Sequence, residues 1–117
     1  MDRLWITILK SKSRRAEPGD VILLRPGVYK GPFDLKKSGT AEKPIVLRGP
    51  VDGEAILEGQ GVTSRSKIIT LNGTHHLYFE RLTFRNAHMA IYAARTGGSK
   101  GLVVRACKIH DVVYGPR

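Results

Sequence analysis

Short runs of alternating apolar and polar residues, separated by turn residues, make up most of this chain. The segment 77–86 aligns with the segment 102–111 at an offset of 25 residues. Alternation with a period of two marks β-strands, and a three-residue step inside each segment marks a bend between two of them. Each segment is therefore predicted to be a bent pair of short strands. The side chains predicted to face inward form four matching pairs, which are Leu77 and Leu102, Phe79 and Val104, Leu82 and Cys107, and Phe84 and Ile109. Those predicted to face outward are Tyr78, Thr83, Arg85, Val103, Lys108 and His110.

A second series of apolar segments runs through the chain at a similar interval. Ile22 is followed by Ile45 after 23 residues, by Ile69 after 24 more and by Ile91 after 22 more. Such spacing favours stacked coils, because each coil of a solenoid lies about 4.8 Å from the last. The segment 55–59 is predicted to lie one coil before residues 82–84. An antiparallel β-sandwich would also have short strands and Gly/Pro turns, but it has no reason to repeat its interior residues at this interval. The predicted fold class is all-β, a single-stranded parallel β-helix of about four coils of 22–25 residues.

Composition limits the class of protein. Of the 117 residues, 41% are hydrophobic and 26% are charged, as is typical of a folded globular chain. The longest early apolar run, 4–9, is far shorter than the roughly 20 residues of a membrane span. The single cysteine, Cys107, excludes an internal disulfide. Residues 1–15 are predicted to be a cap or leader, with both a strand and a helix possible over 3–10, and residues 16–117 the coils.

The run Ala16-Glu17-Pro18-Gly19-Asp20-Val21-Ile22-Leu23-Leu24-Arg25-Pro26-Gly27-Val28-Tyr29 is followed by Ser38-Gly39-Thr40 and Pro44-Ile45-Val46-Leu47. This pattern resembles the opening of right-handed parallel β-helix proteins of the pectin-lyase-like superfamily. Within it, the sequence is most similar to polysaccharide lyases of the chondroitinase B and alginate lyase types. The resemblance extends over residues 16 to 115 and implies a right-handed β-helix of which this chain is the amino-terminal part, truncated at its carboxyl end.

The resemblance also implies a chemistry. Lyases of this group cleave acidic polysaccharides by β-elimination with a Lys and an Arg, often with calcium held by Asn and Glu side chains. No residue of this sequence matches that site, so no catalytic residue and no metal ligand is assigned, and calcium is expected only in a longer protein. The expected function is an amino-terminal part of a protein that binds or processes an acidic polysaccharide, with this chain alone inactive. The alternatives are a carbohydrate-binding or cell-surface β-helix without enzymatic activity, and a solenoid without a ligand.

The partners and location expected follow from charge and family. The chain has 20 Lys and Arg residues against 10 Asp and Glu residues, a formal charge of +10, which suits an anionic partner. No nucleic-acid motif and no membrane span is present, so an acidic polysaccharide is the expected ligand. The remaining coils of a parent chain, or a second copy at an uncapped end, are the expected protein partners. If the protein is like the family, it is secreted, periplasmic or on the cell surface, although no signal peptide is recognised.

Basic and aromatic residues at outward positions are the candidate ligand contacts. Arg25 and Arg48 are predicted to occupy equivalent positions of successive coils, and stacked like charges repel unless an anion bridges them. Glu80 and Arg105 are predicted to match and to form an exposed ion pair. The candidate substrate-binding residues are Arg25, Arg48, Arg81, Arg85, Arg105, Tyr78 and Tyr92.

Other polar residues receive structural interpretations. Asn86 and Asp111, at matching positions, are predicted to form a turn ladder in which short polar side chains satisfy backbone groups. Cys107 is predicted to be a packed interior thiol. The histidines do not converge as metal ligands would and are interpreted as solvated; they are His75, His76, His88 and His110.

Overall fold

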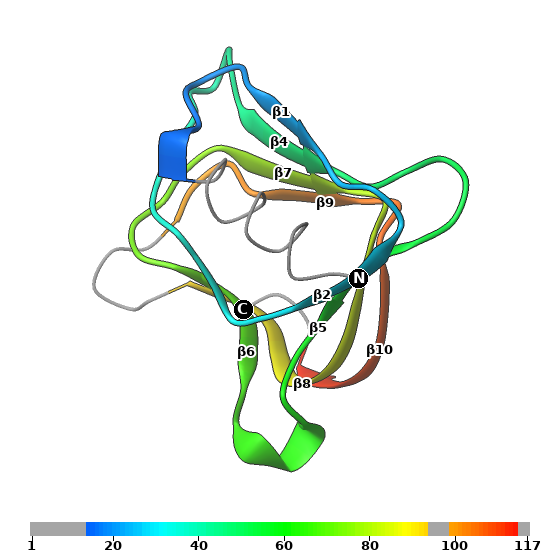
Figure 1. Ribbon diagram of the computed structural model, residues 1–117. Coiled ribbons are helices and arrows are strands. Elements are labelled where there is room, and N and C mark those ends of the chain that lie inside the picture. Colours follow the sequence, from blue (N-terminus) through cyan, green and yellow to red (C-terminus); the bar gives the residue numbers. More distant parts are fainter. Residues whose placement is uncertain (1–13, 94–98, 115–117) are drawn as a thin grey trace.

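The computed structural model describes residues 14–93 and 99–114, which form a parallel β-solenoid of about three turns (Figure 1). The all-β parallel fold class predicted from the sequence is confirmed, with about three turns in place of about four. Sheet A contains β1 (Val21–Leu23), β4 (Ile45–Arg48), β7 (Leu77–Glu80) and β9 (Val103–Arg105), in that spatial order. Sheet B contains β2 (Gly27–Lys30), β5 (Ala55–Glu58), β8 (Leu82–Ala93), β6 (Lys67–Leu71) and β3 (Phe33–Leu35), in that order, and β10 (Lys108–Tyr114) pairs with β8.

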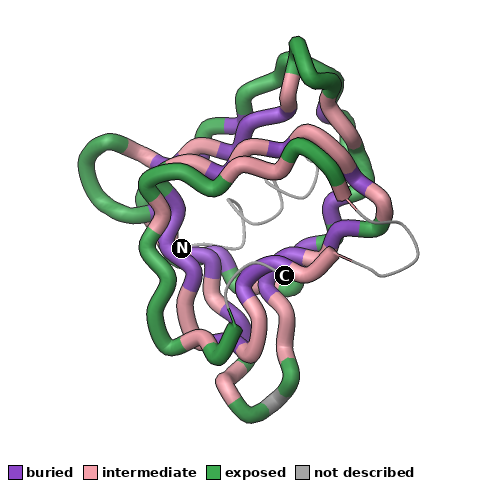
Figure 2. The backbone as a smooth tube through the Cα atoms, turned by 180° about the vertical axis from the view of Figure 1, so that it is seen from behind, coloured by how far each residue is buried: buried purple, intermediate pink, exposed green. Residues whose placement is uncertain are grey.

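Sheet B has two limbs because its longest strand, β8, bends at Asn86. This residue has a left-handed backbone with φ 61°. The part of β8 before the bend pairs with β5, and the part after it pairs with β6. The two limbs and sheet A surround the core on three sides (Figure 2). A short 3-10 helix, η1 (Val62–Ser64), lies in the excursion that joins β5 to β6.

The corners of successive coils repeat the same backbone conformation. Left-handed residues, with φ from 52° to 70°, recur 25 positions apart at three corners. The stacked pairs are His76 and Gly101, Arg81 and Ala106, and Asn86 and Asp111. The previous coil has Gly49 beside Arg81, and a Cβ at Gly49 would lie 1.9 Å from the Arg81 carbonyl oxygen. Close stacking of the backbone therefore requires glycine at that corner.

The interior is filled by the aliphatic and aromatic side chains of the predicted strands. Phe79 and Phe84 are fully buried, and Leu77 and Leu82 are 1% exposed. The predicted alignment of Phe84 with Ile109 in adjacent parallel strands is confirmed. The prediction of burial is wrong for the last coil, where Val104 and Ile109 are each 38% exposed. Leu102 and Cys107, also predicted to be buried, are only partly so. These residues face inward, but no further strand of the described chain covers them.

The second predicted series of stacked residues is wrong in its first half. Ile22 aligns with Leu47, and Ile45 aligns with Leu77. Ile45 and Ile69 lie in different sheets, so the interval of 24 residues between them is not a coil. The alignments of Ile69 with Ile91 and of the segment 55–58 with 82–85 are confirmed. The coil length is also less regular than 22–25 residues, because the excursion containing η1 separates Phe33 from its partner Ile69 by 36 positions.

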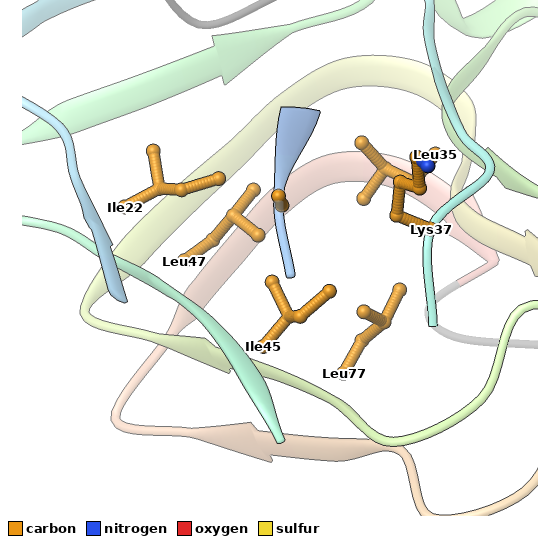
Figure 3. A pocket seen from close by; sticks show the side chains of 7 residues that line it. Ile22, Leu35, Lys37, Ile45, Leu47 and Leu77 are labelled. Atoms are coloured by element: carbon orange, nitrogen blue, oxygen red, sulfur yellow. The ribbon is translucent and has the colours of Figure 1, made fainter. Parts of the chain in front are cut away.

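A small apolar gap lies inside the first coils (Figure 3). Its volume of about 10 Å³ is close to the lower limit for one water molecule, which is roughly 10–15 Å³. The gap is therefore a packing feature and has no room for a ligand. Its lining consists of Ala16, Ile22, Leu35, Lys37, Ile45, Leu47 and Leu77.

Among the residues that the structure describes, no helix has the length and apolar character needed to cross a membrane. The predicted cap or leader falls mostly in residues 1–13, which lie outside the described residues.

Candidate functional site

The outer face of sheet A carries two columns of side chains that run across its four strands. In one column, the strand register aligns apolar residues with a tyrosine. In the other, it aligns an exposed leucine with an alternation of charges. The first column is Val21, Val46, Tyr78 and Val103, and the second is Leu23, Arg48, Glu80 and Arg105. We call the two columns together the sheet A face.

An ion pair connects β4 to β7 on this face. Arg48 Nη2 lies 3.4 Å from Glu80 Oε1, and the two side chains are 36% and 13% exposed. The Nε atom of Arg48 is buried and has no hydrogen-bond partner in the described chain. The guanidinium is therefore held by one carboxylate oxygen and keeps unused donor capacity at the face.

The cation next along the column is held by an aromatic ring. The Cζ atom of Arg105 lies 5.9 Å from the centre of the Tyr78 ring, a cation–π distance. The predicted alignment of Arg105 with Glu80 is confirmed. The predicted ion pair between them is wrong: the carboxylate of Glu80 pairs with Arg48, whereas the guanidinium of Arg105 lies over Tyr78.

A polar groove of about 170 Å³ lies at the corner between sheet A and sheet B. We call it the corner groove. Thr83 Oγ1 donates a hydrogen bond of 3.0 Å to Glu54 Oε1, and Lys108 Nζ lies 3.8 Å from the same oxygen. This contact buries Thr83, which was predicted to be outward and exposed. The groove is lined by Pro50, Val51, Gly53, Glu54, Arg81, Leu82, Thr83, Ala106 and Lys108.

The corner groove continues the sheet A face around the edge of the solenoid. Arg81 follows Glu80 directly, and Ala106 follows Arg105. Arg81 is exposed, so the groove combines an accessible guanidinium with the Lys108 ammonium. Ligand pockets for drug-sized molecules are typically about 300–1,000 Å³. The groove therefore suits one small anionic group or part of one sugar, and not an oligosaccharide.

Three other predicted contacts lie away from the sheet A face. Arg85, on the outer side of β8, donates from Nε to Glu58 Oε1 at 2.9 Å, so its charge is already balanced. Arg25 follows β1, and its carbonyl oxygen accepts a hydrogen bond of 2.7 Å from the Tyr29 hydroxyl. The equivalence of Arg25 with Arg48 is wrong, because Leu23 is the residue that aligns with Arg48.

Tyr92 lies on the second limb of sheet B, in the part of β8 that pairs with β6. Its register partner is Thr70. Lys67 Nζ lies 4.8 Å from the centre of its ring. Tyr92 and Lys67 therefore form a separate cation–π contact on another side of the solenoid, and Lys67 was not predicted as a partner. The two residues lie three positions apart along neighbouring strands after alignment, a diagonal relationship that needs the register to be known.

The predicted turn ladder of Asn86 and Asp111 lies at a stacked left-handed corner. Asparagine and aspartate tolerate this backbone conformation better than most residues. The Asn86 carbonyl oxygen accepts a hydrogen bond of 3.0 Å from the Gly61 amide. The carboxylate of Asp111 lies 3.3 Å from His110 Nδ1. The positions support a structural role, while hydrogen bonding by the two side chains along the ladder stays a prediction.

The acidic side chains do not offer a set of ligands for calcium. In the described residues, no three His, Cys, Asp or Glu side chains gather as a metal site requires. Glu80 is engaged by Arg48, Glu58 by Arg85, and Glu54 by Thr83 and Lys108. Calcium needs six to eight oxygen ligands, and these carboxylates are held separately by cations and a hydroxyl. The residues therefore do not fit a calcium site.

Cys107 is not placed as a nucleophile. Burial raises the pKa of its thiol above the ordinary value, and hydrogen bonding from backbone groups opposes this only in part. The Sγ atom lies 3.4 Å from the Phe79 carbonyl oxygen. A partly buried thiol with a raised pKa is less often ionised, so the interpretation as a packed interior residue is supported.

Sequence reasoning missed the apolar column of the sheet A face. Val21 and Leu23 are 45% and 67% exposed, whereas Val46 is nearly buried beside Tyr78 and Val21 in the register. The alternation of the strands marked these residues as outward, but only the correct register shows that they continue one another across four strands.

A parallel solenoid with an arginine and tyrosine face is the class of protein that these features define. The chain matches the Chondroitinase B family over residues 6–114 and belongs to that family. It is similar to the alginate lyase from Paenibacillus sp. str. FPU-7, with a TM-score of 0.81 and 25% identity, over 92% of this chain and 35% of the lyase. It is also 27% identical over 81 residues to the uncharacterized protein YwoF of Bacillus subtilis (strain 168), covering 67% of this chain and 17% of YwoF. The chain thus spans about a third of the lyase and less than a fifth of YwoF.

Proposed function

We propose that this chain binds an acidic polysaccharide along the sheet A face, as part of a polysaccharide lyase. The observation that carries the proposal is the placement of Arg105 over Tyr78, one strand away from the Arg48–Glu80 pair. The family and the similarity to an alginate lyase support the class of ligand. The finer identity of the sugar belongs to this proposal.

The chemistry of the face suits a uronate sugar. A guanidinium presents paired N–H donors that match a carboxylate in two parallel hydrogen bonds. The Tyr78 ring offers an apolar surface to the C–H groups of a sugar ring, as aromatic side chains do in binding sites. The formal charge of +10 attracts a polyanion from solution at a rate that falls with salt.

The binding direction follows from the columns. Both columns run perpendicular to the strands, so a polysaccharide that contacts all of them lies along the solenoid axis. The corner groove lies beside this path, where Arg81 and Lys108 can receive an anionic substituent of one sugar. The ligand is therefore expected to contact three strands and one edge of the solenoid.

The reaction proposed for the whole protein is β-elimination at a uronate. A base removes the proton beside the carboxylate, and positive charge stabilises the enolate-like intermediate. The arginines described above can hold and neutralise a carboxylate. No described residue is assigned as the base, so this chain alone is expected to bind the polymer without cleaving it. Ultraviolet absorbance of the unsaturated product, at the same polymer concentrations as the binding assay, tests this expectation.

The binding experiment compares two single substitutions of equal charge change. Arg105→Gln removes the cation over Tyr78, and Lys30→Gln removes an exposed cation from β2, on sheet B. We expect Arg105→Gln to weaken binding to a polyuronate about fivefold or more, and Lys30→Gln to have less than a twofold effect. Equal losses for both variants would show that the polymer is attracted by net charge alone, and would contradict binding at this face.

A further inference from the structure

The charges of the second column alternate in sign from strand to strand. Arg48 of β4, Glu80 of β7 and Arg105 of β9 occupy one register position in successive coils. Neighbouring strands lie roughly 4.8 Å apart, so the two arginines start from backbone positions about 9.6 Å apart, with a carboxylate midway. A column of this kind presents a cation only at every second coil.

We infer that the sheet A face selects polysaccharides in which a uronate alternates with a neutral sugar, over polymers with a carboxylate on every sugar. The inference rests on the proposed function and names the substrate class of the same site. A pyranose ring in a polysaccharide advances the chain by about one strand spacing, roughly 4.8 Å. Successive sugars along the axis therefore meet Arg48, Glu80 and Arg105 in turn.

The role of Glu80 is to reject an anion at the middle position. Its side chain is 13% exposed and lies low between the two cations, so it acts on the ligand through its charge more than through contact. A uronate placed there brings two carboxylates close together, whereas a neutral sugar brings hydroxyl or amide groups that can donate to a carboxylate. A sulfate on the intervening sugar meets the same repulsion. The unsulfated alternating polymer is therefore the favoured ligand.

The equivalent column of sheet B provides a matched control. Glu58 of β5 is likewise a partly buried carboxylate paired with an arginine, Arg85 of β8. This pair lies on another side of the solenoid, so its removal changes the net charge as Glu80→Gln does without altering the sheet A face. Comparing Glu80→Gln with Glu58→Gln separates the position of the charge from its amount.

The test measures binding of the 117-residue chain to two oligosaccharides matched in number of carboxylates. One is a hyaluronan oligomer, in which every second sugar is a uronate, and the other is an oligoguluronate. We expect the wild-type chain to bind the hyaluronan oligomer about fivefold more tightly, the factor given by a unit-charge repulsion at about 4 Å in water. Glu80→Gln should bring the ratio close to one, mainly by strengthening oligoguluronate binding, and Glu58→Gln should leave it unchanged.

The outcomes distinguish this inference from the proposed function. Binding of both oligomers with equal affinity by the wild-type chain, or tighter binding of the oligoguluronate, overturns the selection and leaves polysaccharide binding standing. An unchanged ratio in Glu80→Gln also overturns it. Failure of both oligomers to bind overturns the selection and the proposed function together. The wild-type comparison is informative even if Glu80→Gln does not fold.

Discussion

Phe84 and Ile109 occupy the same inward position of consecutive coils, but Phe84 is fully buried and Ile109 is 38% exposed. The difference arises because Phe84 has a strand on each side, β5 and β10, whereas Ile109 has β8 on one side only. Burial in this solenoid thus depends on the number of covering coils and not on the facing of the side chain alone.

This relationship predicts unequal costs of truncation. Phe84→Ala should lower the free energy of unfolding by about 3–5 kcal/mol, because it removes a fully buried ring and leaves a cavity. Ile109→Ala should cost about 1 kcal/mol or less, since much of its surface is already in water. Urea unfolding followed by circular dichroism measures both. Similar losses for the two variants would mean that Ile109 is covered in solution.

Thr74 links two segments that lie far apart in the sequence. Its hydroxyl is 1% exposed and donates a hydrogen bond of 2.6 Å to the Leu35 carbonyl oxygen. Thr74→Val keeps the shape but leaves a buried carbonyl without this donor, so we expect a loss of about 1–3 kcal/mol. Thr74→Ser keeps the hydroxyl and should cost about 1 kcal/mol for the methyl group. Thermal unfolding that ranks Ser below Val in stability would contradict this assignment.

Ala106 has a backbone conformation that suits glycine. Its φ is 54°, and a left-handed L-residue costs roughly 1–2 kcal/mol. Ala106→Gly relieves this strain but increases the freedom of the unfolded chain, so the net stabilisation should be about 0.5–1 kcal/mol. Ala87→Gly is the control, because Ala87 is fully buried within β8 and should lose stability instead. Equilibrium unfolding in urea gives the sign for each variant.

Cys107 should report its surroundings through its alkylation rate. Burial raises its thiol pKa in the folded chain, so less thiolate is present near pH 8 than in the unfolded chain. The rate with iodoacetamide should therefore rise at higher pH for the folded protein than for the protein in urea. By linkage, the folded state keeps the proton longer, so this group lowers stability as the pH rises above the pKa of the unfolded thiol. A folded-state rate profile at lower pH would contradict the direction of the shift.

The repeat between residues 77–86 and 102–111 was sufficient to predict the parallel fold and the register of its last coils. Both segments keep the same interval of 25 because no insertion separates their strands. The earlier coils could not be aligned by counting isoleucines, since Ile45 and Ile69 lie in different sheets and an excursion lengthens the coil between Phe33 and Ile69. Register errors of two residues are enough to move Arg25 out of the column of Arg48.

The candidate site was predictable only in part for the same reason. Arg48, Tyr78 and Arg105 were recognised as outward residues from the alternation of their strands, and the structure brings them onto one face. The choice of ion-pair partner for Glu80 could not be made, because a residue between two cations in successive coils has two equivalent neighbours in sequence terms. Side-chain packing decides between them, and here Tyr78 engages one of the two arginines.

The most direct test of polysaccharide binding at the sheet A face is a titration of the isotope-labelled chain with a uronate oligosaccharide, followed by amide chemical shifts. The account predicts the largest changes at Arg48, Tyr78 and Arg105, on three adjacent strands of sheet A. It predicts little change at Lys30 and Asp34, which are exposed residues of sheet B strands. Shifts centred on sheet B, or changes spread evenly over all exposed cations, would contradict it.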